Sequence, residues 1–158
     1  GSGHDDDARM TEGGVMYEVI YASVVSLAMV LITVTLHFWT LAGLSALLKR
    51  WKQQVRGEIL VVVIVMFAAH MVEISLYGLT YLWIDNNDTA MNLGGAVDGS
   101  FLDHLYFSAA CYTSLGLGDL YPMGTLRLVA GVEALNGLIL ITWSASFAFL
   151  VMQRRWRF

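Results

Sequence analysis

The chain has 158 residues, of which 57% are apolar and 14% are charged, and its mean hydropathy is +0.62. These values favour a membrane protein over a soluble domain. The net charge of −4 gives no sign of nucleic-acid binding, and the single cysteine, Cys111, excludes an intrachain disulfide. No nucleophile stands beside an evident base, so the sequence does not favour an enzyme.

Three long apolar segments follow a polar beginning. Residues 1–14 are acidic and contain glycine, which predicts a flexible tail. The apolar segments cover residues 15–48, 58–84 and 126–152. Each is longer than the roughly 20 residues that an α-helix needs to cross a bilayer. The sequence therefore predicts three transmembrane helices.

Lys and Arg gather at two places, residues 49–56 and the residues after 152, which hold seven of the nine basic side chains. With three spans, these two places lie on the same side of the membrane. By the positive-inside rule, that side is cytoplasmic. We therefore expect a multi-pass protein of the plasma membrane or bacterial inner membrane, with the N-terminus and the polar loop at residues 85–100 outside.

Residues 101–113 form a short segment between the second and third spans. Ser100 and Asp103 have the spacing of a capping box, which predicts a helix that begins at Phe101. This helix is too short to cross a bilayer, so the pattern predicts a re-entrant segment. His104 is expected to be exposed on the outer side, and Thr125 is expected to cap the third span.

The next stretch alternates glycine with other residues. Glycine adopts positive φ at little cost, so this alternation allows successive carbonyl groups to point to one side. Such carbonyls replace the water shell of a cation in a channel. The stretch reads Thr113, Ser114, Leu115, Gly116, Leu117, Gly118, Asp119.

This stretch resembles the selectivity filter of potassium channels, whose usual pattern is T-T-V-G-Y-G-D. The resemblance runs from Phe101 to about Trp156 and includes FSAACYTSLGLGDLYPMGTLRL and AGVEALNGLILITWSASFAFL. It is strongest to small bacterial ion channels of the two-transmembrane pore superfamily. It implies an all-α membrane protein that assembles as a homotetramer in lipid, with an outer helix at 58–84 and an inner helix at 126–152. The first span is then an addition to the minimal pore.

The resemblance also implies roles for the filter residues. The backbone carbonyls of Ser114, Leu115, Gly116 and Leu117 are expected to bind successive K⁺ ions, with no other cofactor. The Ser114 hydroxyl adds a ligand at the inner end. Gly118 allows the chain to turn outward, and Asp119 lies at the outer mouth. The carboxyl end of the pore helix directs partial negative charge toward the cavity below the filter.

Three positions depart from the family pattern. Ser114 replaces threonine, and Leu117 replaces a tyrosine, so we expect Leu117 to be held by packing against Tyr106 and Phe107. Ala110 stands where some members place a carboxylate that pairs with the filter aspartate. These departures leave a weakly selective monovalent cation channel as the alternative to a potassium channel.

Several residues of the inner helix share one face by their spacing of three and four. Two interpretations are open for this face: it lines the central cavity, or its polar members form hydrogen bonds between helices. Gly131 and Gly137 are either a gating hinge or small residues that allow close helix approach, and the sequence favours the second. The face comprises Asn136, Leu140, Trp143, Ser144 and Phe147.

Four ionisable residues lie within the predicted spans: His37, His70, Glu73 and Glu133. At about 1.5 Å per residue, His37 and His70 lie roughly 18 and 20 Å from the basic link, which places them at a similar depth. His70 and Glu73 are three residues apart and share a helix face. The sequence therefore predicts that His37, His70 and Glu73 meet, and that Glu133 braces the pore helix.

Ionisable groups in a bilayer are costly, so this polar cluster needs a reason. The favoured interpretation is a hydrogen-bonded cluster that fixes the first span to the pore. The alternatives are a proton sensor and a metal site of the histidine and carboxylate kind. A rival function from another class is therefore a non-conducting membrane protein that senses protons or binds a metal through this cluster. No span carries regularly spaced arginines, so no voltage sensor is predicted.

Overall fold

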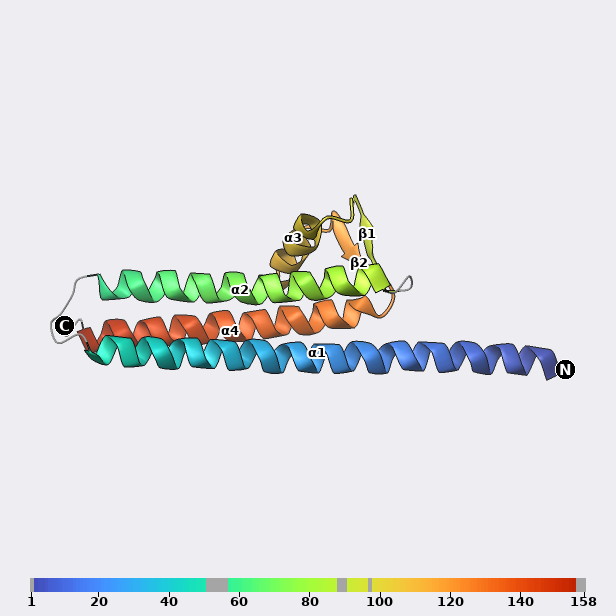
Figure 1. The fold of residues 1–158 in the computed structure, drawn as a ribbon, viewed down its shortest axis with the longest axis horizontal. Helices are drawn as coiled ribbons and strands as arrows, with labels where there is room; N and C mark the ends of the chain where they lie inside the picture. Colours follow the sequence, from blue (N-terminus) through green and yellow to red (C-terminus); the bar gives the residue numbers. More distant parts are fainter. Residues whose placement is uncertain (1, 51–56, 88–90, 97, 156–158) are drawn as a thin grey trace.

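The computed structural model describes residues 2–50, 57–87, 91–96 and 98–155, and the side chains of residues 13–154 within these ranges. Three long helices lie side by side, and a short helix with two short strands lies beside one end of the second and third of them, beyond which the first helix extends (Figure 1). Residues 51–56 of the predicted basic link at 49–56, and residues 156–158, lie outside the described ranges. The elements are α1 (Ser2–Arg50), α2 (Glu58–Asn87), β1 (Leu93–Gly95), α3 (Phe101–Tyr112), β2 (Leu120–Pro122) and α4 (Leu126–Arg155).

The three long helices are apolar and long enough to cross a membrane over Gly13–Arg50, Glu58–Asn87 and Leu126–Arg154. This confirms the three predicted spans. The largest difference from the predicted boundaries is at the start of α1, which continues back to Ser2 through residues predicted to form a flexible tail. The tail contains no proline, so nothing in its backbone stops a helix that α1 has already nucleated.

The short helix α3 begins where the capping box predicts. Ser100 has extended backbone angles, and its hydroxyl oxygen accepts a hydrogen bond from the Asp103 N–H at 3.3 Å. The segment enters from the end of α2 and returns to the start of α4 at the same end of the bundle (Figure 1). This is a re-entrant path, as predicted.

The start of α4 corrects one detail of the prediction. Thr125 accepts a hydrogen bond from the Leu128 N–H through its backbone carbonyl. Its hydroxyl group is buried and has no hydrogen-bond partner among the residues that the structure describes. The side-chain cap predicted for this helix is therefore not formed.

A two-stranded antiparallel sheet joins the loop after α2 to the segment after α3, and the sequence analysis did not predict it. Leu93 pairs with Pro122, and Gly95 pairs with Leu120. A Cβ atom on Gly95 would lie 2.1 Å from the Asp119 carbonyl oxygen, and Gly95 has a φ of +111°. Glycine is therefore required for this close pairing. The sheet ties the outer end of the loop after α3 to α2.

The hydrophobic core lies where α3 packs against α2 and α4. Tyr81 and Phe107 are buried with ring centroids 5.0 Å apart in an edge-to-face arrangement. A Cβ atom on Gly78 would lie 3.1 Å from the Leu105 Cα, so α2 and α3 approach closely at this point. This packing positions the carboxyl end of α3, from which the glycine-rich loop begins.

Candidate functional site

The loop at residues 113–119 has alternating backbone conformations. Ser114, Gly116 and Gly118 have φ values of +56°, +55° and +83°. Among the described residues, Ser114 is the only non-glycine residue with positive φ. A positive φ is unfavourable for serine, so the surrounding chain must hold this residue in place. Alternation of this kind turns the amide N–H groups to one side of the strand and the carbonyl groups to the other.

Hydrogen bonds fix the direction of the first loop amides. The N–H groups of Leu115 and Gly116 both donate to the Ala110 carbonyl oxygen, at 2.9 and 3.3 Å, and that of Ser114 donates to Cys111 at 2.9 Å. The loop therefore starts with its N–H groups directed at the carboxyl end of α3. Among the described residues, no backbone hydrogen bond ends on the carbonyl groups of residues 114–117.

The loop is exposed in the single chain. Leu115 and Leu117 are 64% and 57% exposed, and a Cβ atom on Gly116 or Gly118 would meet nothing within 4 Å. The expected packing of Leu117 against Tyr106 and Phe107 stays a prediction, and Phe107 is buried against Tyr81. The conformation of the loop, not lack of space, is what requires glycine at residues 116 and 118.

A tyrosine of α3 holds the outer end of the loop. The Tyr106 hydroxyl lies 3.1 and 3.0 Å from the two carboxylate oxygens of Asp119 and donates to them. Ala110 has no carboxylate that could pair with Asp119, as the sequence indicates. Tyr106, one turn earlier on α3, links the helix to Asp119. This contact was not predictable from the sequence, in which Tyr106 suggests only a packing partner for Leu117.

The opposite face of α3 carries a stripe of three polar side chains at a spacing of four residues. His104, Ser108 and Tyr112 are all buried. Each contacts a different carboxylate, and two of these carboxylates come from α2 and one from α4. The pairs are His104 with Asp85, Ser108 with Glu133, and Tyr112 with Glu73. We call these three pairs the α3 anchor.

His104 corrects the prediction of an exposed residue. Its Nδ1 atom lies 2.7 Å from the Ser100 carbonyl oxygen, and its Nε2 atom lies 3.1 Å from the Asp85 Oδ2 atom. Burial follows from its position on the face of α3 that packs on α2. Beside it, Asp98 is exposed, and hydrogen bonds from Ser100 lower the pKa of the Asp98 carboxyl group.

Glu133 of α4 lies behind the middle of α3. Its carboxylate accepts a hydrogen bond from the Ser108 hydroxyl at 2.6 Å and another from the Tyr81 hydroxyl. Ser108 also lies 2.9 Å from the Ile74 carbonyl oxygen. Glu133 therefore lies against α3, as the sequence predicts. Glu133 does not join the other three ionisable residues of the spans.

Those three residues do meet. The His37 Nδ1 atom lies 2.9 Å from Glu73 Oε1, and the His70 Nδ1 atom lies 3.1 Å from Glu73 Oε2. Two residues that the sequence analysis did not place there complete the group. The Tyr112 hydroxyl lies 2.8 Å from His70 Nδ1, and the Ser144 hydroxyl lies 3.0 Å from His70 Nε2 and 3.2 Å from His37 Nε2. We call these five residues the membrane cluster.

The inner-helix residues face their own chain. Asn136, Leu140 and Ser144 are buried. The Asn136 amide donates to the Thr33 hydroxyl at 2.8 Å and to the Tyr77 hydroxyl at 3.2 Å, so it links α4 to α1 and α2. The cavity-lining interpretation of these residues is therefore wrong, because an additional span covers this face of α4. The interpretation as hydrogen bonds between helices is the correct one.

Gly137 allows a close contact between α4 and the end of α3. A Cβ atom at this position would lie 2.2 Å from the Tyr112 carbonyl oxygen. At Gly131, a Cβ atom would meet nothing within 4 Å. Close helix approach therefore explains Gly137, as the sequence favoured.

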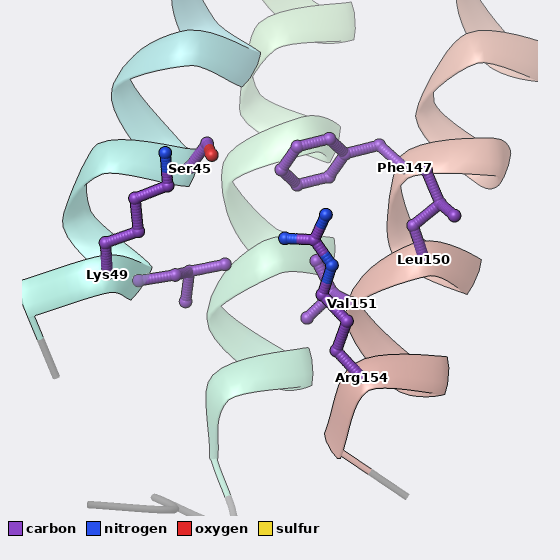
Figure 2. A pocket seen from close by; sticks show the side chains of 7 residues that line it. Ser45, Lys49, Phe147, Leu150, Val151 and Arg154 are labelled. Carbon is purple, nitrogen blue, oxygen red and sulfur yellow. The ribbon is translucent and has the colours of Figure 1, made fainter. Parts of the chain in front are cut away.

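A cavity of about 180 Å³ lies between α1 and α4 at the end of the bundle opposite the glycine-rich loop. Figure 2 shows Lys49 and Arg154 reaching toward it from the two helices, beside Phe147 and Leu150. The cavity is lined by apolar side chains and two basic ones, whereas the glycine-rich loop presents backbone groups. It lies far from residues 113–119 and contributes nothing to their geometry.

Comparison with known proteins gives a family match that includes the glycine-rich loop. A family described as "Ion channel" matches residues 59–154, that is, 96 of the 158 residues. Neither a curated protein nor a solved structure matches the chain. The match contains nearly all of α2 and α4, the α3 anchor and the glycine-rich loop, whereas α1 lies outside it. The chain is a multi-pass membrane protein and belongs to the ion channel family.

Proposed function

We propose that the protein conducts K⁺ passively through a pore formed by four copies of the chain, with residues 113–119 as the selectivity filter. The observation that carries this proposal is the direction of the loop backbone. Its first N–H groups donate to α3, and the carbonyl groups of residues 114–117 accept no backbone hydrogen bond from the described chain. Carbonyl oxygens that are free on one side of a strand are suitable ligands for a dehydrated cation.

The exposure of the loop supports the assembly. A selectivity filter is a ring, and one chain supplies only one of its sides. Leu115 and Leu117 are apolar and exposed in the single chain, so neighbouring copies are the natural partners for them. The exposed side of α4, which carries Leu135, Leu138 and Thr142, is then the side that lines the central cavity.

The charges of the chain support an orientation. The end of the bundle with the loop carries acidic residues, among them Asp98 and Asp119, and the other end carries Lys49, Arg50 and Arg154. By the positive-inside rule, the loop opens to the outside and the C-terminus is cytoplasmic. K⁺ then reaches the filter from the acidic side, which attracts cations.

The test is ion flux from liposomes that contain the purified protein. The wild type is compared with Gly116→Ala and with the control Gly131→Ala, which makes the same chemical change where the Cβ atom has free space. We expect K⁺ flux well above Na⁺ flux in the wild type and the control, and loss of that preference in Gly116→Ala, because alanine disfavours a φ of +55°. Equal K⁺ and Na⁺ flux in the wild type would identify the weakly selective cation channel. Equal behaviour of the two variants would contradict the assignment of the filter.

A further inference from the structure

The membrane cluster has a geometry that filter function does not require. Its five residues come from all four helices: His37 from α1, His70 and Glu73 from α2, Tyr112 from α3 and Ser144 from α4. His37 and Glu73 are fully buried, and His70 has a side chain that is 16% exposed. We propose that the cluster is a binding site for a divalent transition metal, with Zn²⁺ as the best match to its donors.

The donor atoms have the composition of a zinc site. Two imidazole nitrogens, a carboxylate oxygen and a phenol oxygen face one another, and ligand atoms of His37, His70 and Glu73 lie within 4.8 Å of one another. Zn²⁺ prefers four nitrogen, sulfur or oxygen ligands in a tetrahedron. Ca²⁺ and Mg²⁺ need six or more oxygen ligands, so a site with two nitrogens among four donors disfavours them.

The donor atoms already gather around one point. The His37 Nδ1 atom lies 2.9 Å from Glu73 Oε1, and the His70 Nδ1 atom lies 3.1 Å from Glu73 Oε2 and 2.8 Å from the Tyr112 oxygen. Bonds of about 2.0 Å in a tetrahedron place neighbouring ligand atoms roughly 3.3 Å apart. Separations of this size are similar to those that the three contacts show, and the side chains must move apart to accept the ion.

Ser144 provides an outer partner for both histidine ligands. Both Nε2 atoms lie within hydrogen-bonding distance of the single Ser144 hydroxyl oxygen. When a metal occupies the two Nδ1 atoms, each neutral ring carries its hydrogen on Nε2, and both N–H groups donate to the two lone pairs of that oxygen. Without a metal, two neutral rings satisfy the same contacts only as different tautomers, one donating to Ser144 and one accepting its hydroxyl hydrogen. The position of Ser144 is therefore compatible with binding of both rings to one ion.

The Glu73 carboxylate supplies negative charge next to the proposed ion. Net charge within a membrane is costly, so a carboxylate ligand makes binding of a divalent cation at this depth less costly than neutral ligands alone would. Tyr112 directly precedes Thr113, so the bound ion joins α1 and α2 to the residue from which the filter begins.

The test measures metal binding in detergent and does not depend on conduction, so its failure is distinguishable from failure of the proposed channel function. Purified full-length protein is stripped with a chelator and titrated with Zn²⁺, with the bound metal measured by mass spectrometry after dialysis. Co²⁺ replaces Zn²⁺ in a parallel titration, because its visible absorption reports tetrahedral coordination. We expect one ion per chain.

The variants identify the site. His37→Gln and His70→Gln are expected to weaken Zn²⁺ binding more than about 100-fold, since loss of an outer partner alone costs 10–100-fold. Ser144→Ala keeps all four ligands and is expected to weaken binding by roughly that 10–100-fold. The matched control is His104→Gln, which removes a buried histidine that also pairs with a carboxylate. It is expected to lower the unfolding midpoint as the other substitutions behind α3 do, but to bind Zn²⁺ as the wild type does, because all four ligands remain.

Three results would overturn the proposal. The first is a wild type that retains no Zn²⁺ after dialysis. The second is Zn²⁺ binding that His4→Gln abolishes and His70→Gln does not, which would place the ion near the N-terminus. The third is Zn²⁺ affinity that is unchanged in both Ser144→Ala and Tyr112→Phe. These two variants preserve the shape of the core, so they test the site even if the histidine variants fail to fold.

Discussion

The two sides of α3 are held in contrasting ways. On its buried side, His104, Ser108 and Tyr112 each contact a carboxylate of the same chain. On the other side, the loop at residues 113–119 that continues from α3 is exposed, and Cβ atoms on Gly116 and Gly118 would meet nothing within 4 Å. If this loop is the proposed filter, one chain builds its support completely and the filter itself only in part. The missing contacts are those that an ion and neighbouring copies supply in the proposed pore.

This contrast predicts that substitutions behind α3 destabilise the fold, whereas substitutions in the loop change conduction with little effect on folding. The predictions below test that division. They run from the largest expected effect to the smallest.

The largest effect is expected at Gly137. Alanine at this position places a Cβ atom 2.2 Å from the Tyr112 carbonyl oxygen, so α4 or α3 must move. Overpacking of this kind typically costs about 1–3 kcal/mol and sometimes more. Thermal unfolding in detergent should show a clearly lower midpoint for Gly137→Ala. The control Gly131→Ala should unfold at or above the wild-type temperature, because alanine favours a helix and finds free space there. Similar midpoints for the two variants would argue against a close contact at Gly137.

Glu133→Ala should have the second-largest effect. It removes the acceptor of the Tyr81 hydroxyl and one contact of Ser108, while Ser108 keeps the Ile74 carbonyl oxygen. A buried donor without a partner costs about 1–3 kcal/mol, so we expect a loss of roughly that size. The measurement is the unfolding midpoint, and the control is Glu18→Ala on α1. If both substitutions lower the midpoint equally, the α3 anchor does not have the role assigned to it.

Tyr106→Phe removes the hydroxyl that donates to Asp119. Both side chains are exposed, so the loss of stability should be small. The K⁺ over Na⁺ preference in liposome flux should fall, because Asp119 loses its link to α3. Tyr121→Phe, which alters another exposed tyrosine of the same region, should leave that preference unchanged. A clearly lower unfolding midpoint with an unchanged ion preference would contradict the view that this side of α3 affects conduction and not folding.

The smallest effect is expected at Asp98. Its pKa is lowered in the folded chain, mainly by hydrogen bonds from Ser100, so the ionised form is favoured by folding. The resulting stability is present above the unfolded pKa of Asp and is lost as pH falls through the lowered folded value. Asp98→Asn should therefore unfold slightly earlier than the wild type near neutral pH and equally at acid pH. A difference that grows as the pH falls would show the opposite sign and refute this account.

The sequence predicts the local features of this fold well. The capping pair at Ser100 and Asp103, the alternation of glycine at residues 116 and 118, and the i, i+3 pair of His70 and Glu73 all depend on near neighbours. Helix and turn chemistry is readable at that range. The depth of His37 within its span, counted from the basic link, also predicts correctly that it meets His70 and Glu73 of the second span.

The partners of α3 were not predictable in the same way. Asp85, Glu133 and Glu73 come from positions far along the chain, and their pairing depends on how three helices pack. The spacing of four residues among His104, Ser108 and Tyr112 was the available signal for a buried polar stripe. The sheet of β1 and β2 is too short to leave a periodic pattern. The cavity-lining interpretation of one face of α4 is wrong because the residues near this face in the sequence do not show that α1 covers it.

The most direct test of the central claim is the reversal potential of single wild-type channels in a planar bilayer, with K⁺ on one side and Na⁺ on the other. If residues 113–119 select K⁺, the current reverses close to the K⁺ equilibrium potential. Reversal near zero would mean that both ions pass equally, and the filter would then be a weakly selective one.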